Sequence, residues 1–534
     1  MYIPFFYVAY VLIFYEILQY GQLLQDDWSI AENNYFNKNY LNNFINYLNG
    51  FIARPVGALY LSLISFFGYN FIYYFIINIT FYFVFNIIIF KIFEHRYNSS
   101  IAFTIIALLL FPNLNSTNIF SPAAQSLGTI SLFLWSVSFY LIYFGSIKKN
   151  FFYKQLSWFF FILSVLTYEI SFILIIFNIF FYNNSLQKIV NLIVSFKFKN
   201  IFKLKEVKYF FIIFLIIFFY QFFLVKILPF ESSNRYRVFN LEVFNLIIQY
   251  SYVPFILILD TLLFFKKSFY ILSEKIFYNA LLIMLFFLSL KKIQIKDLSN
   301  INKFKKLNLF LIIIVTYLLF LLFFIIATSL PFLEGYYNRA MGAYNFIFSL
   351  FIIFFIICLN ISNYLKKLFL ILFVLINANL FFLQIENNIF SSKLRNDLID
   401  RIISKVPLAY LDKGYVFSIF PTVSSSKPLS QVTFSEESYD FNKALLFRSK
   451  RKLGGIRIYK NIECINRYSL KIKNNKIIYY NPSKSKKSQK LIKVEILLNP
   501  KSKYLFYDYF EDNLIALNFG NHDDLPFKKL INCN

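Results

Sequence analysis

The sequence predicts a polytopic α-helical membrane protein of about 11 spans, followed by a small β-rich extracytoplasmic domain at the C-terminus. Of its 534 residues, 58% are hydrophobic, and the mean hydropathy is +0.58. Long uncharged runs recur, each near the roughly 20 residues that a helix needs to cross a bilayer. Charge becomes frequent only late in the chain, where residues 385–534 hold fourteen of the 27 acidic residues.

The uncharged runs divide the chain into a membrane domain, residues 1–384, and a soluble domain, residues 385–534. We expect spans near residues 2–20, 71–92, 100–112, 126–145, 156–167, 170–182, 209–230, 270–290, 308–331, 345–363 and 368–384. The segments 156–167 and 170–182 are short, so they form either a broken pair that dips from the outer face or one long span. Segment 246–265 is apolar, but a crossing there conflicts with the lysine pattern, so we interpret it as a re-entrant or interfacial helix.

Lysine clusters in short loops set the predicted orientation, because basic residues in such loops stay on the cytoplasmic side. The loops 183–208 and 291–306 carry six lysines each, and they share one side if the N-terminus is cytoplasmic. The loop 21–70 then becomes the first external loop. Its segment 29–70 is amphipathic, which is typical of one or two helices that lie along the outer membrane surface.

Short β-rich runs characterise the C-terminal domain, and clusters of Pro, Asn, Ser and Gly separate them. These runs are residues 415–420, 456–459, 470–472, 477–480 and 491–498. The pattern predicts a small soluble domain of α+β or β-rich type.

Several functional classes lack sequence support. The net charge is +27, but the basic runs have no interleaved stacking aromatics outside the apolar spans, so nucleic acid is not an expected partner. Two histidines cannot build a His-rich zinc site, and the three cysteines form no Cys-x-x-Cys motif. Glycine-rich nucleotide motifs are also missing from the sequence.

The acidic pair Asp26-Asp27 directly follows the first predicted span. Two adjacent charges at the bilayer edge are costly and indicate a functional site. Partial desolvation raises the pKa of a carboxylate, which suits a general base near neutral pH. The alternative is that one acid caps the following helix, but capping requires only one of them. We therefore predict a catalytic role for Asp26 or Asp27.

Glu169 lies in Thr167-Tyr168-Glu169, between two apolar stretches. An ionisable residue at membrane depth indicates a functional site. Two alternatives remain open: Glu169 is simply interfacial, or it pairs with a structural arginine.

Arginines occur in three loops that the predicted orientation places outside, where arginine is unexpected. Arg54 lies in the first of these loops, Arg235 and Arg237 in the second, and Arg339 in the third, together with Tyr336. Arginine forms bidentate hydrogen bonds with phosphate, so we predict that these residues bind a phosphorylated substrate. The alternative is snorkelling, or pairing with one of the nearby glutamates Glu231, Glu242 and Glu334.

These motifs together resemble the GT-C superfamily of integral-membrane glycosyltransferases, which includes protein O-mannosyltransferases, aminoarabinose lipid A transferases and Gtr-type O-antigen glucosyltransferases. Asp26-Asp27-Trp28 resembles the catalytic Asp/Glu motif behind the first helix of that family. Arg54-Pro55 resembles the Arg-Pro or Arg-Trp that often follows it, and Tyr168-Glu169 is similar to a Tyr-Glu element. The likeness covers about the first 180 residues, the middle spans by topology alone, and the C-terminal domain hardly at all.

The resemblance implies a sugar donor on a polyprenyl phosphate and a glycan or lipid acceptor, at the extracytoplasmic face of a bacterial inner membrane. Asp26 or Asp27 would deprotonate the acceptor hydroxyl, which attacks the anomeric carbon and inverts it. The external arginines would stabilise the leaving phosphate. Some members use a divalent cation, which Asp27 and Glu169 could hold here.

Three alternatives remain. A polysaccharide polymerase or ligase would depend on external arginines and would lack the acidic pair. A lipid or glycan transporter would show broken or charged helices near the midplane and inverted repeats, whereas the charges here lie at span ends. A non-catalytic subunit of a membrane assembly is the third.

Overall fold

The computed structural model describes residues 10–11, 15, 27, 30–31, 33–34, 39–51, 54–67, 71–112, 117–181, 185–195, 197–201, 203–220, 303–326, 341–359, 361–405, 415–419, 471–473, 476–482, 491–497, 504–508 and 513–517. The expected segments 246–265 and 270–290 lie outside these residues, as does most of the expected first span.

The described part of the chain is mostly helical and divides into two compact units. Unit 1 comprises Met1–Leu23 and Asn37–Asn388, and unit 2 comprises Leu24–Phe36 and Ile389–Asn534. Among the described residues, four helices are long and apolar enough to cross a membrane: Ile72–Arg96, Ser126–Ile147, Lys305–Phe324 and Asn363–Ile385. They coincide with four of the expected spans and are compatible with a membrane protein.

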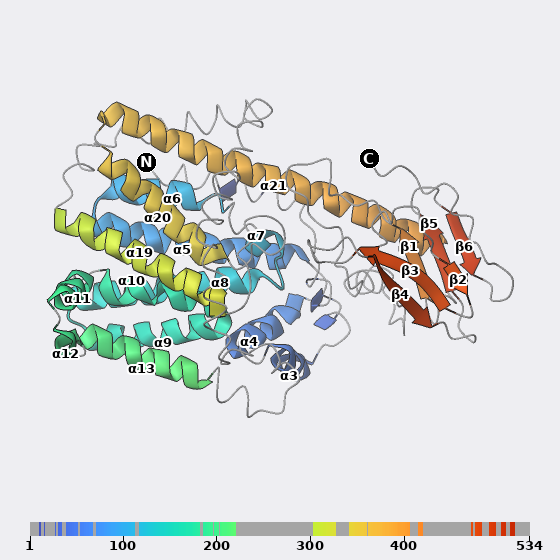
Figure 1. Cartoon of the computed structure of the whole chain (residues 1–534), viewed down its shortest axis with the longest axis horizontal. Helices are drawn as coiled ribbons and strands as arrows, with labels where there is room; N and C mark the ends of the chain where they lie inside the picture. Colours follow the sequence, from blue (N-terminus) through green and yellow to red (C-terminus); the bar gives the residue numbers. More distant parts are fainter. Residues whose placement is uncertain are drawn as a thin grey trace. The chain divides into compact units, whose positions relative to one another are not determined.

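Unit 1 is a bundle of helices (Figure 1). In chain order its helices are α3 (Tyr40–Gly50), α4 (Pro55–Ile64), η1 (Ser65–Phe67), α5 (Phe71–Arg96), α6 (Ser99–Leu109), α7 (Thr117–Phe120), α8 (Ser126–Ile147), α9 (Phe151–Thr167), η3 (Glu169–Leu174), α10 (Ile175–Phe180), α11 (Ser185–Val194), α12 (Phe198–Ile201), α13 (Lys205–Phe218), α19 (Lys303–Ile326), α20 (Gly342–Cys358) and the first part of α21 (Asn363–Lys405). The helix α8 packs against both α5 and α9, α5 also packs against α6, and α19 packs against α20.

Local sequence explains the tight connection between α8 and α9. Lys149 adopts a left-handed conformation with φ of 52°, and the Asn150 N–H donates to the Gly145 carbonyl at 2.8 Å. This pattern satisfies carbonyls left free at the end of α8. A Cβ on Gly145 would lie 2.8 Å from the Tyr153 Cβ, so the approach of the two helices requires glycine there.

Polar side chains inside the bundle bond across helices rather than to solvent. Trp135 Nε1 on α8 donates to Asn178 Oδ1 on α10 at 2.9 Å, and Asn178 Nδ2 donates to Ser138 Oγ at 2.6 Å. All three side chains are buried. Such bonds satisfy polar groups where a bilayer offers no water, and they connect neighbouring helices.

The chain reverses direction at Tyr168, between α9 and η3. Tyr168 has an extended backbone with φ of −155° and ψ of 119°. Ser164 Oγ donates to Ser171 Oγ at 2.9 Å, although residues seven apart in one continuous helix are separated by about 10 Å along the axis. The alternative of one long span over 156–182 is therefore wrong, and α9 is a separate helix from η3 and α10.

The helix α21 continues to Lys405, beyond the boundary that we expected at residue 385. Its polar end is stabilised by an ion pair one turn apart, in which Arg401 Nη2 lies 2.9 Å from Asp397 Oδ2. Charge in this stretch indicated a change of domain in the sequence, but the helix continues through it.

The described strands lie in unit 2 and form two three-stranded sheets. One sheet has the order β1 (Tyr415–Ile419), β5 (Tyr504–Asp508), β6 (Asn513–Leu517), with β1 and β5 parallel and β5 and β6 antiparallel. The other is antiparallel and has the order β2 (Lys471–Lys473), β3 (Lys476–Pro482), β4 (Leu491–Leu497).

Candidate functional site

Arg54 and Glu169 form an ion pair, although 115 residues separate them in sequence. Arg54 Nε lies 2.8 Å from Glu169 Oε2 and 3.0 Å from Glu169 Oε1. The guanidinium carbon also lies 4.4 Å from the centroid of the Tyr168 ring, within the range of a cation–π contact. The side chains of Arg54 and Glu169 are 29% and 9% exposed, so the pair is sheltered from water on the glutamate side.

The start of α4 places Arg54. Pro55 occupies the first helical position, where its missing N–H is no loss, and Arg54 directly precedes it. A cation at a helix N-terminus is disfavoured by the helix dipole, and the Glu169 carboxylate offsets this repulsion. Gly57 lets α4 approach closely, because an added Cβ would lie 3.1 Å from the Thr167 carbonyl oxygen at the end of α9.

Buried serines place Glu169. The Tyr168 carbonyl accepts hydrogen bonds from Ser171 Oγ at 3.0 Å, from the Ser171 N–H at 3.2 Å and from Ser131 Oγ on α8 at 3.3 Å. Ser164 Oγ on α9 also donates to the Ser131 carbonyl at 2.7 Å. The turn that carries Glu169 is therefore held by side chains of α8, α9 and η3 together.

Glu169 pairs with an arginine, as the structural alternative expected, and a functional role of Glu169 stays a prediction. That partner is Arg54, one of the residues predicted to bind phosphate. The pair brings together two of the motifs that resemble the GT-C family.

Asp27 is fully buried, with 0% of its surface exposed. It belongs to the segment Leu24–Phe36 of unit 2, whereas Arg54 and Glu169 belong to unit 1. A shared cation site of Asp27 and Glu169 stays a prediction. Within the described ranges, no group of three or more His, Cys, Asp or Glu side chains gathers as a metal site would require.

Five predicted site residues lie outside the described part of the chain. They are Asp26, Arg235, Arg237, Tyr336 and Arg339.

Sequence reasoning missed the supporting residues Ser131, Ser164, Ser171 and Gly57. Serine and glycine are common at helix contacts in membranes, so neither residue type draws attention by itself. Ser131 and Ser164 precede the Tyr168-Glu169 element and Ser171 follows it, and these serines were a sequence signal for a hydrogen-bonded turn.

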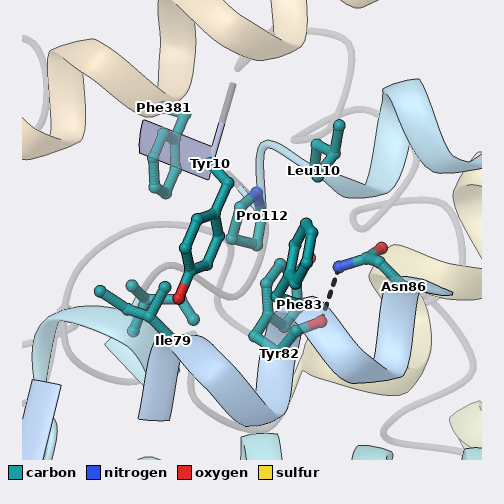
Figure 2. A pocket seen from close by; sticks show the side chains of 9 residues that line it. Tyr10, Ile79, Tyr82, Phe83, Asn86, Leu110, Pro112 and Phe381 are labelled. Carbon is teal, nitrogen blue, oxygen red and sulfur yellow. Dashed lines mark hydrogen bonds between the residues drawn. The ribbon is translucent and has the colours of Figure 1, made fainter. Parts of the chain in front are cut away.

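A small cavity lies between α5, the end of α6 and Tyr10 (Figure 2). Its volume is about 10 Å³, near the space that one water molecule needs. Tyr10, Phe83, Pro112 and Phe381 line it with apolar surface, and Asn86 Nδ2 donates to the Tyr82 carbonyl at 2.8 Å beside it. The cavity is too small for a sugar or a lipid chain.

Comparisons with known proteins leave the family open: no family model, curated protein or solved structure matches this chain.

Proposed function

We propose that the chain is a multi-pass membrane glycosyltransferase that moves a sugar from a polyprenyl-phosphate donor to an extracytoplasmic glycan or lipid acceptor. The observation that supports this most is the ion pair of Arg54 with Glu169. It joins Arg54-Pro55 and Tyr168-Glu169, two motifs that resemble GT-C glycosyltransferases. Charged residues from two distant motifs that meet in an apolar bundle indicate a site rather than chance placement.

In this proposal, Glu169 fixes the guanidinium of Arg54 beside Tyr168. Arg54 then presents its charge to the donor phosphate, which gains negative charge as the bond to the sugar breaks. Asp26 or Asp27 removes the proton from the acceptor hydroxyl. Asp27 is fully buried, so its carboxylate is sheltered from bulk water. Arg235, Arg237, Tyr336 and Arg339 complete the contacts with the substrate.

The membrane arrangement belongs to the same proposal. The chain crosses about 11 times, with the candidate site on the extracytoplasmic side of a bacterial inner membrane. The sheets of unit 2 form a β-rich extracytoplasmic domain within residues 385–534. The four described helices that are long and apolar enough to cross a membrane support the membrane location.

The test is mass spectrometry of surface glycans from cells with the wild-type gene, a deletion, Asp26→Asn, Asp27→Asn, Glu169→Gln or Glu94→Gln, at matched membrane levels. Glu94→Gln is the control. Glu94 also pairs with a basic residue, Lys91, one turn away on α5, but both side chains of that pair are exposed. We expect a sugar to be missing in the deletion, in Asp27→Asn and in Glu169→Gln, and present in Glu94→Gln.

An unchanged glycan profile in the deletion would overturn the proposal and favour transport or assembly. Loss in the deletion with full activity in both Asp26→Asn and Asp27→Asn would remove the acidic pair from the mechanism. The polymerase or ligase alternative would then be the better one.

A further inference from the structure

Arg96 and Lys305 meet where two apolar helices end. Arg96 is the last residue of the apolar helix Ile72–Arg96, and Lys305 is the first residue of the apolar helix Lys305–Phe324. Lys305 Nζ donates to the Arg96 carbonyl at 3.3 Å. In a bilayer, residues at the ends of apolar spans lie at the depth of the lipid headgroups. The Lys305 ammonium is therefore held at the backbone of Arg96, and both basic residues lie at headgroup depth in the proposed membrane arrangement.

Aromatic side chains shape the surroundings of Arg96. Its guanidinium carbon lies 5.5 Å from the centroid of the Phe181 ring, beyond the end of α10. Burial raises the pKa of the neighbouring Tyr97 to about 12, and the Arg96 charge opposes this rise. Tyr97 is thus neutral at physiological pH. Arg96 and Lys305 are both half-buried, so any ligand here would be partly sheltered from water.

Neighbouring elements indicate that lipid rather than bulk water meets this end of the bundle. The helices α11 and α12 and the first turn of α19 lie at the same end of unit 1 (Figure 1). The helix α11 is amphipathic: Leu186 is buried, whereas Ile193 and Val194 are 45% and 72% exposed. Exposed apolar side chains beside lysines are typical of a helix at the membrane surface.

We propose that Arg96 and Lys305 form a binding site for the phosphate group of an anionic phospholipid in the membrane leaflet at this end. Arginine and lysine together complement a phosphate in charge and in hydrogen-bond donors. Basic pockets between membrane helices bind anionic headgroups in this way. The proposal rests on the membrane placement given above and is independent of the glycosyltransferase activity.

The experiment titrates the full chain, purified in neutral detergent, with phosphatidylglycerol and follows bound lipid by native mass spectrometry. The test variant is Arg96→Gln with Lys305→Gln, and the control is Lys199→Gln with Lys203→Gln, which removes equal charge from exposed sites at the same end. We expect the test variant to bind roughly tenfold more weakly, and the control to stay within about twofold of wild type.

Equal weakening in the test and control variants would overturn the site in favour of diffuse charge attraction. Binding of phosphatidylcholine as tight as that of phosphatidylglycerol would exclude recognition of an anionic headgroup. If glycerol 3-phosphate without acyl chains bound as tightly, the ligand would be a soluble phosphate and not a lipid. Should the double variant fail to fold, Lys305→Gln alone tests the same contact, with the lipid-induced rise in Tm as the readout.

Discussion

The Arg54–Glu169 contact puts two opposite charges into a bundle whose described helices are otherwise mostly apolar. Transfer of either charge out of water is unfavourable, and each partner offsets that penalty for the other. Removal of one partner therefore leaves the other charge without this compensation. Removal of both leaves only neutral polar groups.

We predict that Arg54→Gln and Glu169→Gln are coupled in stability. Each single substitution should lower the free energy of unfolding by about 1–3 kcal/mol, because it breaks a hydrogen bond between charged groups. The double substitution should lose less than the sum of the two, with a coupling of about 0.5–3 kcal/mol. Thermal unfolding of the purified variants in detergent measures the cycle, and strictly additive effects would contradict the pairing.

A second prediction compares substitutions of two buried serines on α8, Ser131 and Ser136. Ser131 Oγ donates to carbonyls of Ser164 and Tyr168 on the neighbouring turn, whereas Ser136 Oγ donates to Phe133 within its own helix. Ser131→Ala should lower stability by about 1 kcal/mol and reduce glycan transfer, and Ser136→Ala should do neither. Equal effects of the two substitutions would show that the bonds across helices do not position Glu169.

Sequence alone was sufficient to single out Arg54 and Glu169, because charges are rare between apolar runs. It did not reveal their pairing, since 115 residues separate them and no periodicity links a loop to a distant turn. The predicted orientation placed both residues on the external side, and this shared side was the one sequence signal that they could meet. The serines that fix the turn were missed because their role depends on which helices pack together.

At the scale of helices, α4 and α9 pack closely at the candidate site because Gly57 has no side chain. The expected helices around 71–92 and 126–145 needed only hydropathy to predict, since a long uncharged run has few alternatives in a membrane. The reversal at Tyr168 could not be decided in this way, because two short apolar runs and one long run have the same hydropathy. The continuation of α21 past residue 385 was missed because frequent charges, which suggested a soluble domain, are equally compatible with an exposed helix.

Gly57→Ala tests the close approach. The new Cβ would lie 3.1 Å from the Thr167 carbonyl oxygen and would push α4 away from α9. We expect a loss of stability of about 1–3 kcal/mol and reduced activity. Gly50→Ala is the matched control, because nothing lies within 4 Å of its added Cβ, and it should be close to neutral. Similar unfolding curves for the two variants would contradict the packing argument.

At the scale of the whole bundle, basic residues and the candidate site lie at different ends of unit 1. Figure 1 places α11 and α12 at one end and α4 toward the other. The loop lysines predicted this separation through the preference of basic residues for the cytoplasm. Their pattern could not predict which side chains meet at each end.

Cysteine labelling tests the sidedness of this arrangement. The three native cysteines are first replaced by serine. A single cysteine is then introduced at Asn46 in α3 or at Lys149 between α8 and α9, both of which are exposed. We expect a membrane-impermeant maleimide to label Asn46→Cys in intact spheroplasts and Lys149→Cys only after lysis. The opposite pattern would invert the proposed topology.

The tight turn between α8 and α9 has a consequence for how the protein is made. Gly145, the left-handed Lys149 and the reciprocal bonds of Ser131 and Ser164 all lie within the hairpin formed by α8 and α9. Two helices that satisfy each other's polar groups can leave the translocon as a pair, whereas either one alone would expose hydroxyl groups to lipid. In the proposed multi-pass arrangement, the hairpin is thus suited to enter the bilayer as one insertion unit during synthesis, before α10, α19 and α20 pack around it.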